Sequence, residues 1–104
     1  MKRIAVSITE SEKEISPAIN YCEYYYLVDY KDKKIVSINK VRNPYKNENE
    51  ILKLVQFIKD QKTNVLITGN LEESSLKMLN KANIKVITDL GETFDVVKNY
   101  ISNN

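Results

Sequence analysis

Hydrophobic residues fall into short runs of strand length, separated by polar loops and by segments with helical periodicity. The central run, at residues 65–68, contains three apolar residues and a threonine, and turn or helix-start residues flank it on both sides. Continuous apolar runs of this length are typical of strands buried on both faces, as in a parallel sheet covered by helices. The pattern therefore predicts a buried strand at the centre of a sheet.

The rest of the chain alternates between the two periodicities. Strands are predicted at residues 4–8, 24–30, 34–41 and 84–87, and helices at residues 48–60, 72–81 and 92–101. In the first of these helices, Ile51, Leu54 and Ile58 recur at helical spacing. An Asn-Pro pair breaks the third strand, and Asn83 ends the second helix. The predicted element order is therefore βββαβαβα.

This order favours one economical topology. The first three strands have no crossover helix between them, so we expect an antiparallel meander. Each later strand follows a helix, and right-handed crossovers place it parallel to the first strand. The result is an α/β fold of the ribonuclease H-like type, with a mixed five-stranded sheet in the order 3-2-1-4-5 and one domain over residues 1–104. Its crevice is expected at the carboxyl ends of strands 1 and 4, where the loop at residues 9–20 lies opposite Gly69 and Asn70.

Composition removes several classes of function. The net charge is +2 with both signs interspersed, so no basic face for nucleic acid is predicted, and no apolar run approaches the roughly 18 residues of a membrane span. The chain has no histidine, the commonest general base. The strands that would carry the carboxylates of a two-metal nuclease, residues 3–8 and 65–68, contain none. We therefore expect a protein that is not an enzyme, and the absence of a signal-peptide pattern after Met1 indicates the cytoplasm.

The segment after the central strand is a candidate site. Gly69 and Asn70 stand between that strand and the helix predicted from Glu72, where backbone N–H groups and the helix dipole favour an anionic ligand. Asn70 and Glu73, three residues apart, also fit a capping box. Both roles stay open, because a helix cap and an anion site can coexist.

Cys22 is the only cysteine and the only soft metal ligand. One thiolate cannot hold a structural zinc ion or a bare iron-sulfur cluster, which need four protein ligands. It could anchor a cluster that arrives already assembled, and a homodimer would bring a second thiolate. The alternative is that Cys22 is a small buried residue.

Tyrosines gather around the second predicted strand. Alternation places Tyr24, Tyr26 and Tyr30 on one face of the sheet and Tyr25 on the other. They could stack bases or form a partner surface, or they could fill gaps between the sheet and its helices. No basic stripe accompanies them, which disfavours nucleic acid.

Several segments together resemble a known family. They are the strand opening at residues 3–6, the Ser16-Pro17 loop, the tyrosine-rich segment 24–29, the Asn43-Pro44 break, Thr68-Gly69-Asn70, and residues 84–86. In order and spacing, over almost the whole chain, they are similar to the dinitrogenase iron-molybdenum cofactor biosynthesis family, which includes NifX- and NafY-type carriers and the C-terminal domain of NifB. The resemblance implies the ribonuclease H-like fold and binding of iron-molybdenum cofactor, or of an iron-sulfur precursor, during nitrogenase maturation for nitrogen fixation.

Carried onto this chain, the resemblance implies a small iron-sulfur cluster carrier with its site in the crevice loops. Ser16, Cys22, Gly69 and Asn70 would contact the cluster or another anionic ligand, and Cys22 would bind metal. A protein of cluster assembly or a second copy would be the partner. Residues 19–22 lack the family's glycine and arginine, and residues 45–49 lack its histidine and glycine. These departures favour the alternative, an interaction module of the same fold that has lost cluster binding.

Overall fold

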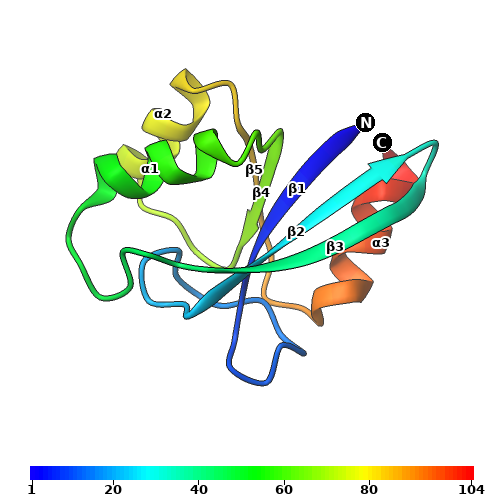
Figure 1. Cartoon of the computed structure of the whole chain (residues 1–104), viewed down its shortest axis with the longest axis horizontal. Helices are drawn as coiled ribbons and strands as arrows, with labels where there is room; N and C mark the ends of the chain where they lie inside the picture. Colours follow the sequence, from blue (N-terminus) through cyan, green and yellow to red (C-terminus); the bar gives the residue numbers. More distant parts are fainter.

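The computed structural model describes all 104 residues, which form one mixed sheet and three helices (Figure 1). The strands are β1 (Lys2–Ile8), β2 (Tyr24–Lys31), β3 (Lys34–Arg42), β4 (Val65–Thr68) and β5 (Lys85–Thr88), and the helices are α1 (Ile51–Asp60), α2 (Glu73–Lys81) and α3 (Thr93–Asn103). The sheet order is β3-β2-β1-β4-β5, with β1 antiparallel to β2 and parallel to β4. The predicted ribonuclease H-like α/β fold is therefore confirmed. None of the three helices has the length and apolar character that crossing a membrane requires.

Helices cover both faces of the sheet. On one face, Leu54 of α1 and Leu79 of α2 pack with Leu66 of β4 in a buried cluster. On the other face, Val97 of α3 packs with Ile67 of β4 in a second cluster. Neighbouring residues of β4 serve different clusters because successive strand side chains point to opposite faces. Burial of each such side chain stabilises the fold by roughly 1.5–3 kcal/mol, so an apolar run without alternation is what a doubly covered strand requires.

The tyrosines of β2 divide between the two faces as predicted. Tyr25 lies in the cluster beneath α1 and α2, whereas Tyr24 and Tyr26 pack beside α3. Tyr26 stacks on Phe94 of α3, with ring centroids 5.6 Å apart. These rings fill the space between sheet and helices.

The first helix begins three residues later than predicted, at Ile51 and not at residue 48. The preceding residues form turns: the Asn47 N–H donates to the carbonyl of Asn20 at 2.8 Å, and Asn47 has a positive φ of 63°. Glu50 is the N-cap with a non-helical φ of −106° and ψ of 61°, so the helix starts only at Ile51.

The predicted capping box of Asn70 and Glu73 is wrong. The N-cap of α2 is Glu72, and its side chain makes no capping hydrogen bond. Asn70 lies two residues earlier, because its N–H pairs with the carbonyl of Pro17 and the chain needs two further residues to enter the helix. A tertiary hydrogen bond has displaced the local capping pattern.

Asn83 ends α2, as predicted, and it does so in the left-handed region with a φ of 63°. The N–H of Ile84 donates back to the carbonyl of Leu79 at 3.0 Å and closes the last turn. Asn83→Ala is expected to lower the free energy of unfolding by about 1 kcal/mol, since a residue with a Cβ and no local side-chain hydrogen bond is strained there. Asn83→Gly is expected to be neutral or slightly stabilising. Urea denaturation measures both, and equal stabilities of the two variants would show that backbone strain does not decide this helix end.

Candidate functional site

The loop between β1 and β2 is joined directly to the end of β4 at the carboxyl edge of the sheet. The N–H groups of Gly69 and Asn70 donate to the carbonyls of Ser16 and Pro17, at 2.9 and 2.8 Å. A Cβ at position 69 would lie 2.6 Å from Pro17 Cα and 3.0 Å from the Ser16 carbonyl oxygen. The predicted meeting of the two segments is confirmed, and only glycine allows the two backbones to approach this closely.

These hydrogen bonds correct the expected use of Gly69 and Asn70. Both N–H groups are occupied by the loop, so neither can donate to a ligand. Gly69 is buried, and so is Ser16, whose hydroxyl donates to the carbonyl of Ala18 within its own loop at 3.2 Å. Of these three predicted contacts, only the exposed Asn70 lines the crevice beside the junction.

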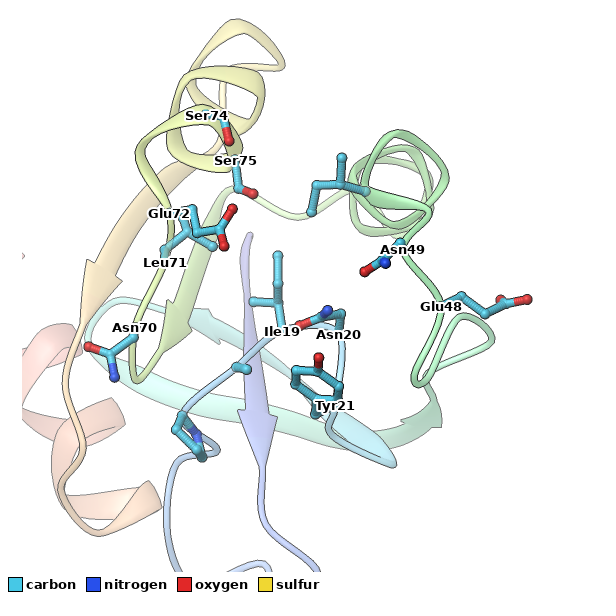
Figure 2. Close-up of a pocket in the computed structure, with 13 residues that line it drawn as sticks. Ile19, Asn20, Tyr21, Glu48, Asn49, Asn70, Leu71, Glu72, Ser74 and Ser75 are labelled. Carbon is cyan, nitrogen blue, oxygen red and sulfur yellow. The ribbon is translucent and has the colours of Figure 1, made fainter.

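That crevice has a volume of ≈ 580 Å³ (Figure 2). Its walls are the loop at residues 17–21, the segment that leads into α1, and the first turn of α2. The amino ends of two helices therefore face one hollow, which concentrates the positive ends of their dipoles there. A volume of this size is typical of a small-molecule site.

The amino end of α2 supplies hydrogen-bond donors to the crevice. The N–H groups of residues 71–75 have no acceptor in the chain, because the first helical bond runs from Leu76 N–H to the Glu72 carbonyl at 3.0 Å. Ser75 is 6% exposed, its hydroxyl makes no hydrogen bond in the chain, and Figure 2 shows it directed into the crevice. Sequence reasoning missed Ser75, although its spacing of four residues from the buried Leu79 places it on the inner side of α2. The buried side-chain atoms without a partner are the hydroxyls of Thr63 and Thr93, so the unpaired Ser75 hydroxyl is open to the crevice and can pair with a polar atom there.

Carboxylates oppose the helix ends. Glu48 and Glu72 line the crevice, and no lysine, arginine or cysteine does. Figure 2 shows Glu72 directed toward the centre of the crevice, whereas Glu48 points away from it. An anion in the crevice would therefore be attracted by the free N–H groups and repelled by Glu72.

Asn43 holds two walls of the crevice together through hydrogen bonds, a role that the sequence pattern did not reveal. It is 3% exposed, and its Nδ2 donates to the carbonyls of Ile19 and Cys22, at 3.1 and 3.0 Å. Its Oδ1 accepts from the N–H of Tyr45 at 3.0 Å. One side chain thus ties the early loop to the segment that leads into α1. In the sequence it is visible only as half of a strand-breaking Asn-Pro pair.

Cys22 lies in the core and does not line the crevice. It is 5% exposed, its thiol donates to the Ile19 carbonyl at 3.6 Å, and burial raises its pKa. No three cysteine or carboxylate side chains are grouped so that they could hold a metal ion. A bond from Cys22 to a cluster metal stays a prediction, and it would require the loop in front of the thiol to move.

Cys22 is expected to react with iodoacetamide at least about 100-fold more slowly in the native protein than in denaturant, because reaction needs both local opening and deprotonation of a buried thiol. Mass spectrometry of quenched samples gives the two rates. The control is Ser102→Cys in a Cys22→Ala background, whose thiol lies at an exposed position. The native rate reports how often the loop opens. A native rate within about tenfold of the denatured rate would mean that the loop opens readily and that the thiol is available to a cluster.

Solved structures with the same fold span nearly the whole chain. The crystal structure of PH0822 superposes with a TM-score of 0.86 at 22% identity, covering 98% of this chain and 92% of that one. The apo form of the orange protein from Desulfovibrio gigas gives 0.81 at 21% identity, covering 99% and 89%. A NifB-type protein from Thermotoga gives 0.76 at 19% identity, covering 98% and 89%. At these identities the likeness establishes the fold alone.

The family relationship comes from comparing the amino-acid sequence with models of protein families. No curated protein sequence matches the chain at a significant level. The model of the family described as dinitrogenase iron-molybdenum cofactor, however, matches residues 1–103, which is all of the chain except its last residue. The resemblance noted from strand openings and loop residues is thereby confirmed over the whole domain. The chain belongs to the dinitrogenase iron-molybdenum cofactor family.

Proposed function

We propose that this protein is a non-catalytic, cytoplasmic carrier that holds a metal-sulfur cluster, such as iron-molybdenum cofactor or an iron-sulfur precursor, as cargo in the crevice. The observation that carries the proposal is the amino end of α2, where residues 71, 72, 74 and 75 line the hollow, their N–H groups have no acceptor in the chain, and the Ser75 hydroxyl is unpaired. The sulfides and carboxylates on the surface of such a cluster are acceptors with negative charge. Helix N-termini bind groups of this kind without a basic side chain.

Retention of the cargo would rest on hydrogen bonds and shape. The crevice wall offers no thiolate or imidazole, so a cluster would enter and leave without exchange of its metal ligands. A carrier must release what it holds, and hydrogen bonds to a helix end break more readily than metal–thiolate bonds. Cys22 would add a metal bond only in a second, opened state of the loop.

Glu72→Gln is expected to strengthen binding of an anionic metal-sulfur probe by about tenfold. The Glu72 carboxylate is directed into the crevice and repels a dianion there, and removal of one such charge is worth roughly 1–2 kcal/mol at a partly solvated site. Tetrathiomolybdate suits this test, because it is a small dianion of molybdenum and sulfur with strong visible absorbance. Anaerobic equilibrium dialysis measures its dissociation constant.

Glu73→Gln is the matched control for that experiment. Glu73 is the next residue of α2, its side chain is 83% exposed and pairs with Lys77 at 3.6 Å, and it does not line the crevice. Its variant is expected to stay within about twofold of the wild type. Ser75→Ala is expected to weaken binding about fivefold through one lost hydrogen bond. Equal effects of the Glu72 and Glu73 variants would place the anion outside the crevice.

The chemistry of the crevice also supports a second function, an interaction module that has lost cluster binding. Glu72 disfavours an anion, and Cys22 is buried. β3 is a long edge strand with Val36 and Ile38 exposed, which gives a second copy or a cluster-assembly protein both backbone and apolar surface to pair with. A metal-free protein after anaerobic purification from its native source, with no affinity for tetrathiomolybdate and a dimer in analytical ultracentrifugation, would decide for this function.

A further inference from the structure

A second hollow lies at the opposite end of the sheet from the crevice, where β1, β4 and β5 begin. Its volume is ≈ 820 Å³, and its walls come from the start of β1, the turn between β2 and β3, the start of β5 and the end of α3. Figure 1 shows both chain ends and the tip of the β2–β3 hairpin together at this edge. Segments that are far apart in the sequence therefore surround one concave space.

The lining of this hollow is basic. Its lysines are Lys2, Lys31, Lys33 and Lys85. None of them forms an ion pair within the chain. Asp32 is the one acidic side chain in the lining, and Asp29, farther along β2, is already neutralised by Arg3 at 2.7 Å. Because the lining lysines outnumber the one acidic side chain and surround a concave wall, the hollow has a net positive potential.

Two lysines near this edge have a local explanation that the lining lysines lack. Lys59 and Lys81 lie in the last turns of α1 and α2, where a positive charge stabilises the carboxyl end of a helix. The lining lysines lie on strands and in a turn, which have no comparable dipole. Glu48 and Glu72, in contrast, line the crevice at the other edge. The linings of the two hollows therefore carry opposite charge.

Two tyrosines add hydroxyl donors to the hollow. Tyr30 is 7% exposed, and burial raises the pKa of its hydroxyl, which therefore stays protonated at neutral pH. Tyr100 also lines the hollow, and the Lys85 Nζ lies 5.4 Å from the centroid of its ring. Ammonium and phenol groups all donate, so the lining is suited to a ligand whose surface consists of acceptors.

We propose that this hollow is a second binding site, distinct from the crevice, for a small anion that carries at least a pair of phosphate groups. A phosphate oxygen accepts from ammonium and hydroxyl groups alike, and lysine binds it as a point charge without a fixed geometry. A pair of phosphates is needed because the lysines approach the hollow from three separate segments, β1, the β2–β3 hairpin and β5. The concave shape favours a small molecule, since a flat macromolecular surface would not reach the tyrosines of the wall.

The test uses protein without tags, because residues 1 and 104 also line the hollow. Pyrophosphate is titrated at low salt while the backbone amides are followed by heteronuclear NMR. The site variant combines Lys2→Gln with Lys85→Gln. The control combines Lys59→Gln with Lys81→Gln, which removes the same net charge from the same edge without changing the lining.

We expect the largest shifts at residues of the hollow, and a dissociation constant that rises about tenfold or more in the site variant but less than about twofold in the control. ADP, which adds a nucleoside to the same phosphate pair, distinguishes the sources of the ligand. Tighter binding than pyrophosphate identifies a nucleotide, and equal binding identifies the phosphate groups alone; both support the site. The proposal is overturned by the absence of shifts at about 1 mM ligand, by shifts confined to the crevice, or by equal weakening in both variants. A single-stranded oligonucleotide that binds more tightly than ADP and weakens equally in both variants would also overturn it, in favour of a nucleic-acid surface.

Discussion

Replacement of Gly69 with alanine is expected to lower the free energy of unfolding by about 2–4 kcal/mol. The new Cβ would lie 2.6 Å from Pro17 Cα and 3.0 Å from the Ser16 carbonyl oxygen, and it would overlap the side chain of Leu90. Backbone atoms cannot move aside as a flexible side chain can. The loop must therefore separate from β4 and weaken the hydrogen bonds that Gly69 and Asn70 donate to it. Overpacking accounts for about 1–3 kcal/mol and each weakened hydrogen bond for about 1 kcal/mol.

Urea denaturation measures this loss, and Gly91→Ala is the matched control. A Cβ at Gly91 would approach only side-chain atoms, with Val96 Cγ2 at 2.9 Å and Asp89 Oδ1 at 3.1 Å, so its expected cost is below about 1 kcal/mol. Hydrogen exchange gives an independent readout, because the Asn70 amide should lose protection in Gly69→Ala before the core does. If both alanine variants were equally stable, the contact between loop and strand would not be what constrains position 69.

Asn43→Ala is expected to cost about 2–4 kcal/mol. The substitution leaves the N–H of Tyr45 and the carbonyl of Cys22 without the partners that Asn43 provides, in a region closed to water. The carbonyl of Ile19 is affected less, because it also accepts from the hydroxyl of Tyr25. Asn43→Asp should be worse at neutral pH, since a carboxylate would face two carbonyl oxygens. Burial and those oxygens would raise the folded-state pKa of the new carboxyl. The Asn43→Asp variant would therefore be most stable below about pH 4, and its free energy of unfolding would fall as the pH rises.

Asn39→Ala is the control for Asn43→Ala. Asn39 lies on the edge strand β3, is exposed, and makes no side-chain hydrogen bond, so its replacement should change stability by less than about 0.5 kcal/mol. Thermal and urea denaturation of both variants provide the comparison. A loss below about 1 kcal/mol for Asn43→Ala would show that this hydrogen-bonded connection between loop and helix is dispensable.

Gly69→Ala and Asn43→Ala act on opposite sides of the loop between β1 and β2. Gly69 holds its first part against β4, and Asn43 holds its second part against the segment before α1. Neither makes contact with the interior of the crevice, yet the separation of its walls depends on both. Molecules of either variant that remain folded should therefore bind an anion in the crevice more weakly than the wild type does.

Local pattern was sufficient for most of the fold. The run at Val65–Thr68, the helical spacing before Asp60 and the helix end at Asn83 all report the conformation of their own segment, and each was correctly placed. The errors lie where a distant segment competes with a local preference. Asn70 pairs with Pro17 of the early loop while Glu72 is the N-cap of α2, and the turn before α1, which pairs with Asn20, extends to the N-cap Glu50.

The sequence by itself determined the order of elements and the sheet topology, because hydrophobic period reports local structure and connections between strands have a preferred hand. The family was visible in the order and spacing of short segments such as Ser16-Pro17 and Thr68-Gly69-Asn70. Only the tertiary structure decided which polar groups are available. It used the N–H groups of Gly69 and Asn70 within the chain, buried Cys22, left Ser75 unpaired, and gathered lysines from three separate segments around one hollow. The physical reason is that hydrogen-bond pairing, burial and local potential depend on which distant segments meet, and no periodicity within one segment records those meetings.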